Sequence, residues 1–255
     1  MLGDDELEPD GGWVRGLIAS LAVLVVLAGG GWLSLTLTRT AEPEQVPAAR
    51  PTWQLALVDS TPESAAMEAA ATWPGIEQET VIAACQSAEP VVNGVGCVSL
   101  RGNWAYIEQI GLPAILRLSG VQPRPNGQVL LIGIVEDQIL LRHQGQELRV
   151  PARQLDRWWL GDFFVVWPDA GSLLRPGQSG VEVRQAKTLA AQLRHEPWTG
   201  VVDDIYDPSF TRWVEGFQRR NGLQDDGVIG PVTRLFLKAP HLEGPSLIRE
   251  LNGAD

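Results

Sequence analysis

The sequence predicts three structural parts in order: a single membrane-spanning helix, a mixed α+β domain, and an all-α domain of three helices. The stretch from Gly16 to Thr38 contains no charged residue, and Arg15 and Arg39 flank it. The middle of the chain has helix-forming runs first and short apolar runs separated by Gly, Pro, Asn and Asp afterwards. The last third returns to helical periodicity. Helices followed by antiparallel-type strands indicate an α+β architecture for the middle part.

Composition excludes several classes of partner. The 255 residues carry a net charge of −11, which argues against nucleic acid because its binding depends on Lys and Arg neutralising phosphates. His195 and His241 are isolated, and no His, Cys and carboxylate residues have the spacing of a metal site. We therefore expect no metal, no cofactor and no nucleic-acid partner.

The apolar segment 16–38 is expected to be an uncleaved membrane anchor. A helix rises ~1.5 Å per residue, so this segment crosses a ~30 Å hydrocarbon layer with some tilt. A cleaved signal peptide is the alternative, but residues 1–15 are acidic where a signal peptide is basic, and no A-x-A site follows. We expect a short cytoplasmic tail at 1–15 and an extended Pro- and Ala-rich tether at 39–52.

The two cysteines, Cys85 and Cys97, both follow the predicted anchor. A disulfide between them would place the large C-terminal part in an oxidising compartment. The alternative is a pair of buried free thiols. One Arg flanks each end of the anchor, so the positive-inside rule does not decide the orientation.

The mixed domain is predicted at 53–168. Strong helix formers indicate helices at 64–73 and 77–88, and a third short helix at 102–111 is expected to end at Gly111. β-Branched and apolar runs predict strands at 113–120, 128–137, 138–144, 147–155 and 163–169. Three tryptophans lie close together at 158, 159 and 167, and we interpret them as core packing.

The helical domain is predicted at 171–240. Its first helix, at 181–195, places Val183, Ala186, Ala190 and Leu193 on one face. A second helix starts at Pro208 with Asp207 as N-cap, ends before Gly222, and carries the apolar stripe Phe210, Val214 and Phe217. A third helix follows Gly230, and the tail at 241–255 adds at most a weak helix at 246–251.

A dense motif runs through this domain: Leu, Gly, Gly-Val and Leu, then Val-x-x-Phe-Gln, Gly-Leu, Asp-Gly, Gly and Thr. It resembles the three-helix, type 1 peptidoglycan-binding domain. The matching positions are Leu174, Gly177, Gly180, Val181, Leu189, Val214, Phe217, Gln218, Gly222, Leu223, Asp226, Gly227, Gly230 and Thr233.

The stretches AACQSAEPVVNGVGCVSLRGNWAYIEQIGLPAILRL and LDRWWLGDFFVVWPD resemble the periplasmic part of general secretion pathway protein A. That family places a papain-like domain, similar to bacteriocin-processing cysteine peptidases, before a peptidoglycan-binding domain. The family's ATPase is missing, because no G-x-x-x-x-G-K-[ST] loop occurs in this sequence.

The peptidase-like domain is predicted to be catalytically inactive. A papain-like peptidase needs a Cys, a His and an orienting Asp or Asn. The residues before the helix at 77–88 include no Cys, Gln128 begins the strand where the His is expected, and Arg142 and His143 lie where the Asp is expected. A rearranged pair of Cys85 and His143 is the alternative, and nothing in the spacing supports it.

These features predict a non-enzymatic, inner-membrane-anchored periplasmic protein that binds peptidoglycan. The resemblance implies that it assists assembly or insertion of the type II secretion secretin through the cell wall. Implied partners are peptidoglycan, the membrane, the secretin, a GspB-like protein and a separate ATPase. A cell-wall peptidase or amidase is the alternative function. A regulator that uses the peptidase-like fold as a recognition surface is a third possibility.

The peptidoglycan site is predicted on the polar flank of the second helix and on the turns at its ends, because the apolar stripe must face the core. Arginines there would pair with the carboxylates of stem peptides. The alternative for each residue is a role as a cap or as solvated surface. The predicted residues are Tyr206, Asp207, Arg212, Gln218, Arg219, Asp226 and Thr233.

Overall fold

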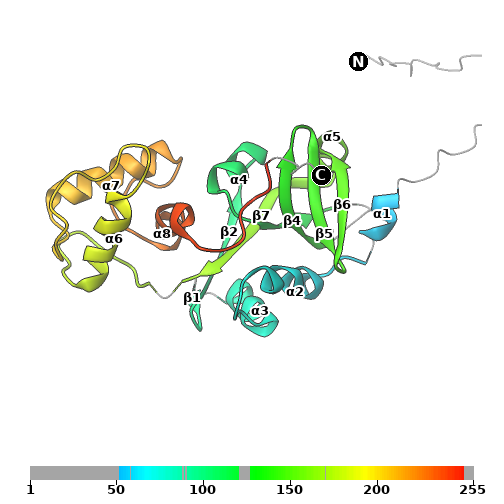
Figure 1. Ribbon diagram of the computed structural model, residues 1–255, viewed down its shortest axis with the longest axis horizontal. Coiled ribbons are helices and arrows are strands. Elements are labelled where there is room, and N and C mark those ends of the chain that lie inside the picture. The colour runs from blue at the N-terminus through cyan, green and yellow to red at the C-terminus, as the bar shows by residue number, and fades with distance from the viewer. Residues whose placement is uncertain are drawn as a thin grey trace, which may run out of the picture. The chain divides into compact units, whose positions relative to one another are not determined.

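The computed structural model describes residues 52–57, 59–87, 89, 91–120, 127–169 and 171–249 (Figure 1). The predicted cytoplasmic tail, the anchor at 16–38 and all of the tether except residue 52 lie outside these described residues. Within the described ranges, no helix is both long enough and apolar enough to span a bilayer.

A seven-stranded sheet, antiparallel at every strand pair, forms the centre of the first half, which we call the sheet lobe (residues 52–168). The strand order is β1-β2-β7-β3-β4-β5-β6. The strands are β1 (Val91–Val92), β2 (Val95–Arg101), β3 (Ala114–Leu118), β4 (Gln128–Val135), β5 (Gln138–His143), β6 (Gln146–Pro151) and β7 (Trp159–Pro168).

Helices cover the sheet because both of its faces are apolar. Alternate residues of the strands point to opposite faces. One face packs against α2 (Pro62–Thr72) and α3 (Gln78–Gln86) (Figure 1). Ala65, Ala66 and Ala69 of α2 belong to this buried cluster. The opposite face packs against α1 (Thr52–Ala56), α4 (Trp104–Ile110) and α5 (Ala152–Leu155). Trp158, Trp159 and Trp167 are buried, which confirms their interpretation as core.

The predicted helices at 64–73, 77–88 and 102–111 are confirmed, and Gly111 ends α4 in the left-handed conformation. The strand predicted at 147–155 is half wrong. Its second half is the helix α5, because Pro151 has no N–H with which to continue the ladder. The hairpin β1–β2 was not predicted. It turns at Asn93 and Gly94, both with positive φ, as a two-residue hairpin turn requires.

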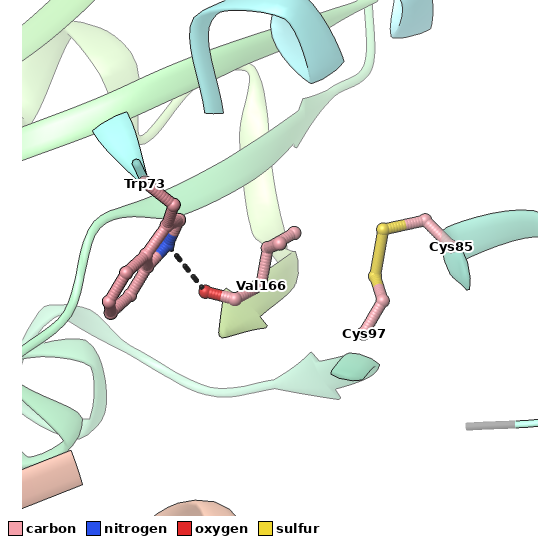
Figure 2. Close-up of a disulfide and its surroundings, with 4 residues drawn as sticks. All are labelled: Trp73, Cys85, Cys97 and Val166. Carbon is pink, nitrogen blue, oxygen red and sulfur yellow. Dashed lines mark hydrogen bonds between the residues drawn. A yellow bond between two sulfur atoms is a disulfide. The ribbon is translucent and has the colours of Figure 1, made fainter. Parts of the chain in front are cut away.

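Two long-range contacts attach the helical layer to the sheet (Figure 2). Cys85 of α3 and Cys97 of β2 form a disulfide. Trp73, just after α2, donates its indole N–H to the carbonyl oxygen of Val166 in β7 over 3.1 Å. Each helix of this layer is therefore fixed to a different strand.

The second half, which we call the helical lobe (residues 171–241), contains three helices and a short 3₁₀ turn. They are α6 (Val181–Ala191), α7 (Pro208–Arg220), α8 (Pro231–Lys238) and η1 (Ala239–His241). Asp207 caps α7 by accepting from the backbone N–H groups of Ser209 and Phe210. The predicted start of this helix is confirmed.

A weak helix was expected at 246–251, and residues 246–249, the described part of this segment, are not helical. Ile248 instead pairs in parallel with Gly133 of β4, donating to the carbonyl of Ile132 and accepting from the N–H of Ile134. The partner strand β3 begins only opposite Leu131, so the tail satisfies backbone groups that β3 leaves free. Only a glycine fits at 133, since an added Cβ would lie 2.7 Å from the Cβ of Ile248.

Replacing both cysteines tests how much the α3–β2 connection contributes. The double variant Cys85→Ala/Cys97→Ala should lose about 2–3 kcal/mol of unfolding free energy, because the disulfide restricts the unfolded chain. Chemical denaturation measures this loss. A reductant should lower the stability of the parent by a similar amount and leave the variant unchanged. Equal stability of parent and variant would contradict the expectation.

A candidate binding pocket between two lobes

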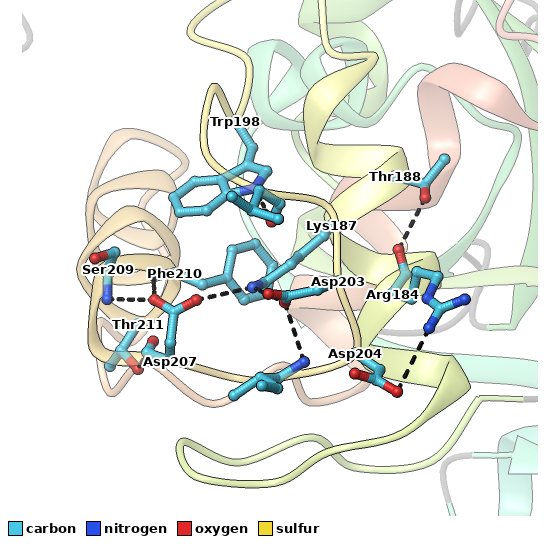
Figure 3. A network of polar contacts seen from close by, with 12 residues as sticks. Arg184, Lys187, Thr188, Trp198, Asp203, Asp204, Asp207, Ser209, Phe210 and Thr211 are labelled. Atoms are coloured by element: carbon cyan, nitrogen blue, oxygen red, sulfur yellow. Dashed lines mark hydrogen bonds and ion pairs between the residues drawn. The ribbon is translucent and has the colours of Figure 1, made fainter.

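A buried lysine organises the helical lobe (Figure 3). Lys187 of α6 is fully buried, and its Nζ donates to Asp203 Oδ1 over 2.7 Å and to Asp207 Oδ2 over 2.9 Å. The same Nζ lies 5.3 Å from the ring centre of Phe210 and 5.5 Å from that of Trp198. One side chain thus connects α6, the loop before α7 and the start of α7.

The charges of this network stabilise one another. Hydrogen bonds from Lys187, and then from the backbone N–H groups of Phe210 and Ser209, lower the pKa of Asp207 to about 2. Burial alone would lower the pKa of Lys187, but its hydrogen bonds to Asp203 and Asp207 outweigh burial and raise it. Lys187 was not among the predicted residues, although a charge on the apolar face of α6, between Val183 and Ala190, was a visible signal.

A second polar hub closes the joint between α7 and α8. Gln218 is 1% exposed. Its Nε2 lies within hydrogen-bond distance of Asp226 Oδ1, the Val228 carbonyl and Thr233 Oγ1, and its Oε1 accepts from the N–H of Gly227. The hydroxyl of Tyr206 donates to the carbonyl of Gly227 over 2.7 Å. The turn at 226–227 is therefore held from inside the lobe.

These contacts correct part of the predicted peptidoglycan site. Tyr206, Gln218 and Thr233 are buried and engaged within the lobe, so the expectation that they border an open groove is wrong. Asp207 is a helix cap and an ion-pair partner of Lys187.

The other three predicted residues are exposed. Arg219 pairs with Asp225 over 3.0 Å at the surface, and Asp226 accepts the N–H of Val228 within its own turn. With Arg212, they form the surface that the sequence predicted, and the structure does not join them into a pocket.

A pocket of about 360 Å³ lies where the two lobes meet, and none of the seven predicted residues lines it. Its walls come from α4, the segment after α6, the end of α7, and α8 with η1. The lining residues are Gln109, Ile110, Leu193, Arg194, His195, Glu196, Phe217, Arg220, Asn221, Phe236, Ala239 and Pro240.

The floor of this pocket is apolar and includes Phe217. The expectation that the stripe of α7 is entirely closed to a ligand is therefore wrong at its last residue. Gln109 donates to Asn221 across the lobes over 2.8 Å, and Arg220 pairs with Glu196 over 2.7 Å.

Two further side chains of the lining, Arg194 and His195, lie on the rim of the pocket. Arg194 and His195 are exposed and have no carboxylate partner among the described residues. An apolar floor with a free guanidinium at its edge suits a ligand that carries alkyl groups beside a carboxylate.

The positions considered for peptidase chemistry are not assembled. The sulfur of Cys85 is held in the disulfide and cannot act as a thiolate nucleophile. His143 is 4% exposed, and Gln128 opens β4 as expected. The described residues also contain no group of three or more His, Cys, Asp or Glu side chains arranged to hold a metal ion.

Residues 179–237 match the family model described as "Putative peptidoglycan binding domain", which confirms the resemblance of the helical lobe. No curated protein matches the chain in sequence. Among solved structures, the chain is similar to a periplasmic domain of the EpsAB fusion protein of the Vibrio vulnificus type II secretion system. The TM-score is 0.49 at 21% identity, over 76% of this chain and 95% of that chain.

Two further similarities involve peptidase domains. The peptidase C39 like domain of the toxin secretion ATP-binding protein from Vibrio parahaemolyticus gives a TM-score of 0.26 at 21% identity, over 30% of this chain and 61% of that chain. A double glycine motif protease from an AMS/PCAT transporter gives 0.27 at 19% identity, over 41% of this chain and 81% of that chain.

The lysine network predicts a specific acid sensitivity. The pKa of Asp207 is about 2 in the folded chain and about 3.9 in an unfolded one. The unfolded state therefore binds the proton first, and the stabilisation present above pH ~4 is lost as the pH falls toward ~2. Asp207→Asn should cost roughly 1 kcal/mol at neutral pH, while keeping the N-cap, because Asn caps equally well.

Unfolding free energies, measured by denaturation between pH 2 and 7, test this acid sensitivity. The variant should show a flatter acid dependence than the parent. Asp204→Asn is the matched control, because Asp204 makes only an exposed pair with Arg184. The same pH profile for Asp207→Asn and the parent would show that the network does not carry the acid response.

Proposed function

We propose that the chain is a non-catalytic cell-envelope protein that binds peptidoglycan through its helical lobe. The observation that carries the proposal is the match of residues 179–237 to the peptidoglycan-binding family. This range contains α6, α7 and all of α8 except its last residue. The buried network around Lys187 and Gln218 supports it, because this network gives the lobe a fixed shape on which a ligand can rest.

Within this proposal, the pocket between the lobes receives the wall peptide. Stem peptides of peptidoglycan combine small alkyl side chains with carboxylates. The floor of Leu193, Phe217 and Phe236 would cover the alkyl groups, and Arg194 would pair with a carboxylate. Wall binding gains from many copies acting on one polymer, so weak binding at a single site suffices.

The proposal places the described part of the chain in the periplasm. Segment 16–38 would anchor it in the inner membrane, with a cytoplasmic tail at 1–15 and a tether at 39–52. The Cys85–Cys97 disulfide supports an oxidising compartment. The proposed domains are then a peptidase-like domain at 53–168, a peptidoglycan-binding domain at 171–240 and a tail at 241–255.

The finer role rests on the sequence resemblance to general secretion pathway protein A. We propose that the chain assists the type II secretion secretin in passing the cell wall, together with a GspB-like protein and a separate ATPase. The competing function, a wall peptidase or amidase, has no support at the residues considered, because Cys85 is oxidised and Gln128 cannot act as a base.

Sedimentation with purified sacculi tests the proposal. The parent should sediment with sacculi and leave them intact. Arg194→Ala/His195→Ala should weaken binding about tenfold, the loss expected for one charge-assisted contact. Arg212→Ala/Arg219→Ala removes two cations from the surface predicted by sequence and should bind like the parent.

Each outcome has one meaning. If the parent stays in the supernatant, the chain does not bind peptidoglycan. If the Arg212 and Arg219 variant alone loses binding, the ligand lies on the polar flank of α7 and not in the pocket. If sacculi are digested by the parent, the chain is an enzyme.

A further inference from the structure

The strand β6 forms one edge of the sheet. The opposite edge strand, β1, has only two residues, whereas β6 has six. Within the described ranges, no further strand pairs with the outer side of β6. An edge strand carries backbone N–H and C=O groups that no neighbouring strand satisfies, so it can serve as a template for a strand of another chain. The outer side of β6 is therefore a candidate interaction surface.

The ladder with β5 determines which residues of β6 direct their backbone groups outward. The N–H of Ala152, just after β6, donates to the carbonyl of Asp137 over 2.8 Å, and this bond continues the β5–β6 register by one pair. Along an antiparallel ladder, hydrogen-bonded pairs alternate with pairs that are not hydrogen-bonded. Counting back from Ala152, every second residue bonds to β5, and the residues between them, Glu147 and Arg149, direct their N–H and C=O groups away from the sheet.

The outward groups of β6 are accessible. No other described residue forms a hydrogen bond with the backbone of Glu147 or Arg149, and their side chains are 41% and 58% exposed. Pro151 has no N–H, and it also takes an outward position, where no ladder bond to β5 is lost. On the other face of the strand, Val150 is buried and Leu148 is half-buried against the core of the sheet.

We propose that β6 pairs in antiparallel orientation with β6 of a second copy of this chain, about a twofold axis at Leu148. In this register, Glu147 of each copy lies opposite Arg149 of the other. Both residues direct their backbone groups outward, so each pair can exchange both backbone hydrogen bonds. Leu148 of the two copies would meet at the axis and extend the apolar face of the sheet across the interface.

The charges of β6 select this register. The alternation of outward groups also allows a twofold axis at Glu147 or at Arg149, but those registers place two carboxylates or two guanidinium groups directly opposite each other. Like charges in that position destabilise a strand pair, and unlike charges stabilise it. Within one copy, Arg149 Nε lies 3.8 Å from Glu147 Oε1, an exposed contact that is worth little and can be exchanged for the contact between copies. The strand is thus complementary to itself only when Leu148 lies on the axis.

Cysteine cross-linking of the full chain in proteoliposomes tests the proposal. In Leu148→Cys, the two cysteines would face each other at a pair that is not hydrogen-bonded, where the Cα atoms are ~4.5 Å apart, within the range that a disulfide spans. Mild oxidation should therefore give a covalent dimer on a non-reducing gel. Gln146→Cys is the matched control, because it is more exposed on the same face but would lie ~14 Å from its counterpart. This control and the parent should stay monomeric on the gel.

Charge exchange tests the register independently. Arg149→Glu places a carboxylate opposite Glu147 and should slow cross-linking of Leu148→Cys about tenfold, whereas the exchange Glu147→Arg/Arg149→Glu should restore it. Sedimentation equilibrium of the same charge variants without the added cysteine, in detergent, should show the dissociation constant rising about tenfold and returning to that of the parent. The proposal is overturned if neither method detects a dimer, if Gln146→Cys cross-links as fast as Leu148→Cys, or if the charge exchange does not restore pairing.

Discussion

The arrangement of the two lobes depends on one buried carboxylate. Asp169 follows β7, and its N–H donates to the carbonyl of Gly94 in the β1–β2 turn. Its side chain is fully buried and accepts from Arg234 Nε over 2.7 Å and from Lys238 Nζ over 2.8 Å. Burial alone would raise the pKa of Asp169, but these two partners lower it. A buried charge is tolerated only when it is fully paired, so α8 has little freedom to move away from the end of the sheet.

In the helical lobe, buried and fully paired polar groups also hold the loops in place. Three short helices bury little apolar surface, so loops of this length need other constraints. Lys187 and Gln218 supply them by placing a polar group at the centre of each loop cluster, where every partner is satisfied. A fully satisfied polar network specifies one arrangement of the chain more strictly than apolar contacts do. Gln218, Asp226, Gly227 and Thr233 are separated in the sequence, and in the structure they form a single hydrogen-bond network that joins α7 to α8.

The features that could be predicted from the sequence depend on residues that are neighbours in the chain. The Asp207 cap, the glycine after α4 and the alternating strands all follow from local chemistry. The Asn93-Gly94 hairpin was equally local and was overlooked. The pocket between the lobes could not be predicted, because Gln109 and Asn221 are distant in sequence and meet only after both lobes have formed. The seven proposed binding residues were chosen because they are polar. Tyr206, Gln218 and Thr233 are buried, because polar side chains can also form hydrogen bonds inside the lobe.

The pocket between the lobes depends on the joint at Asp169. The pocket between the lobes takes Gln109 and Ile110 from one lobe and Phe217 and Arg220 from the other, so any ligand that fills it also opposes separation of the lobes. Loss of the joint would therefore separate the two halves of this pocket.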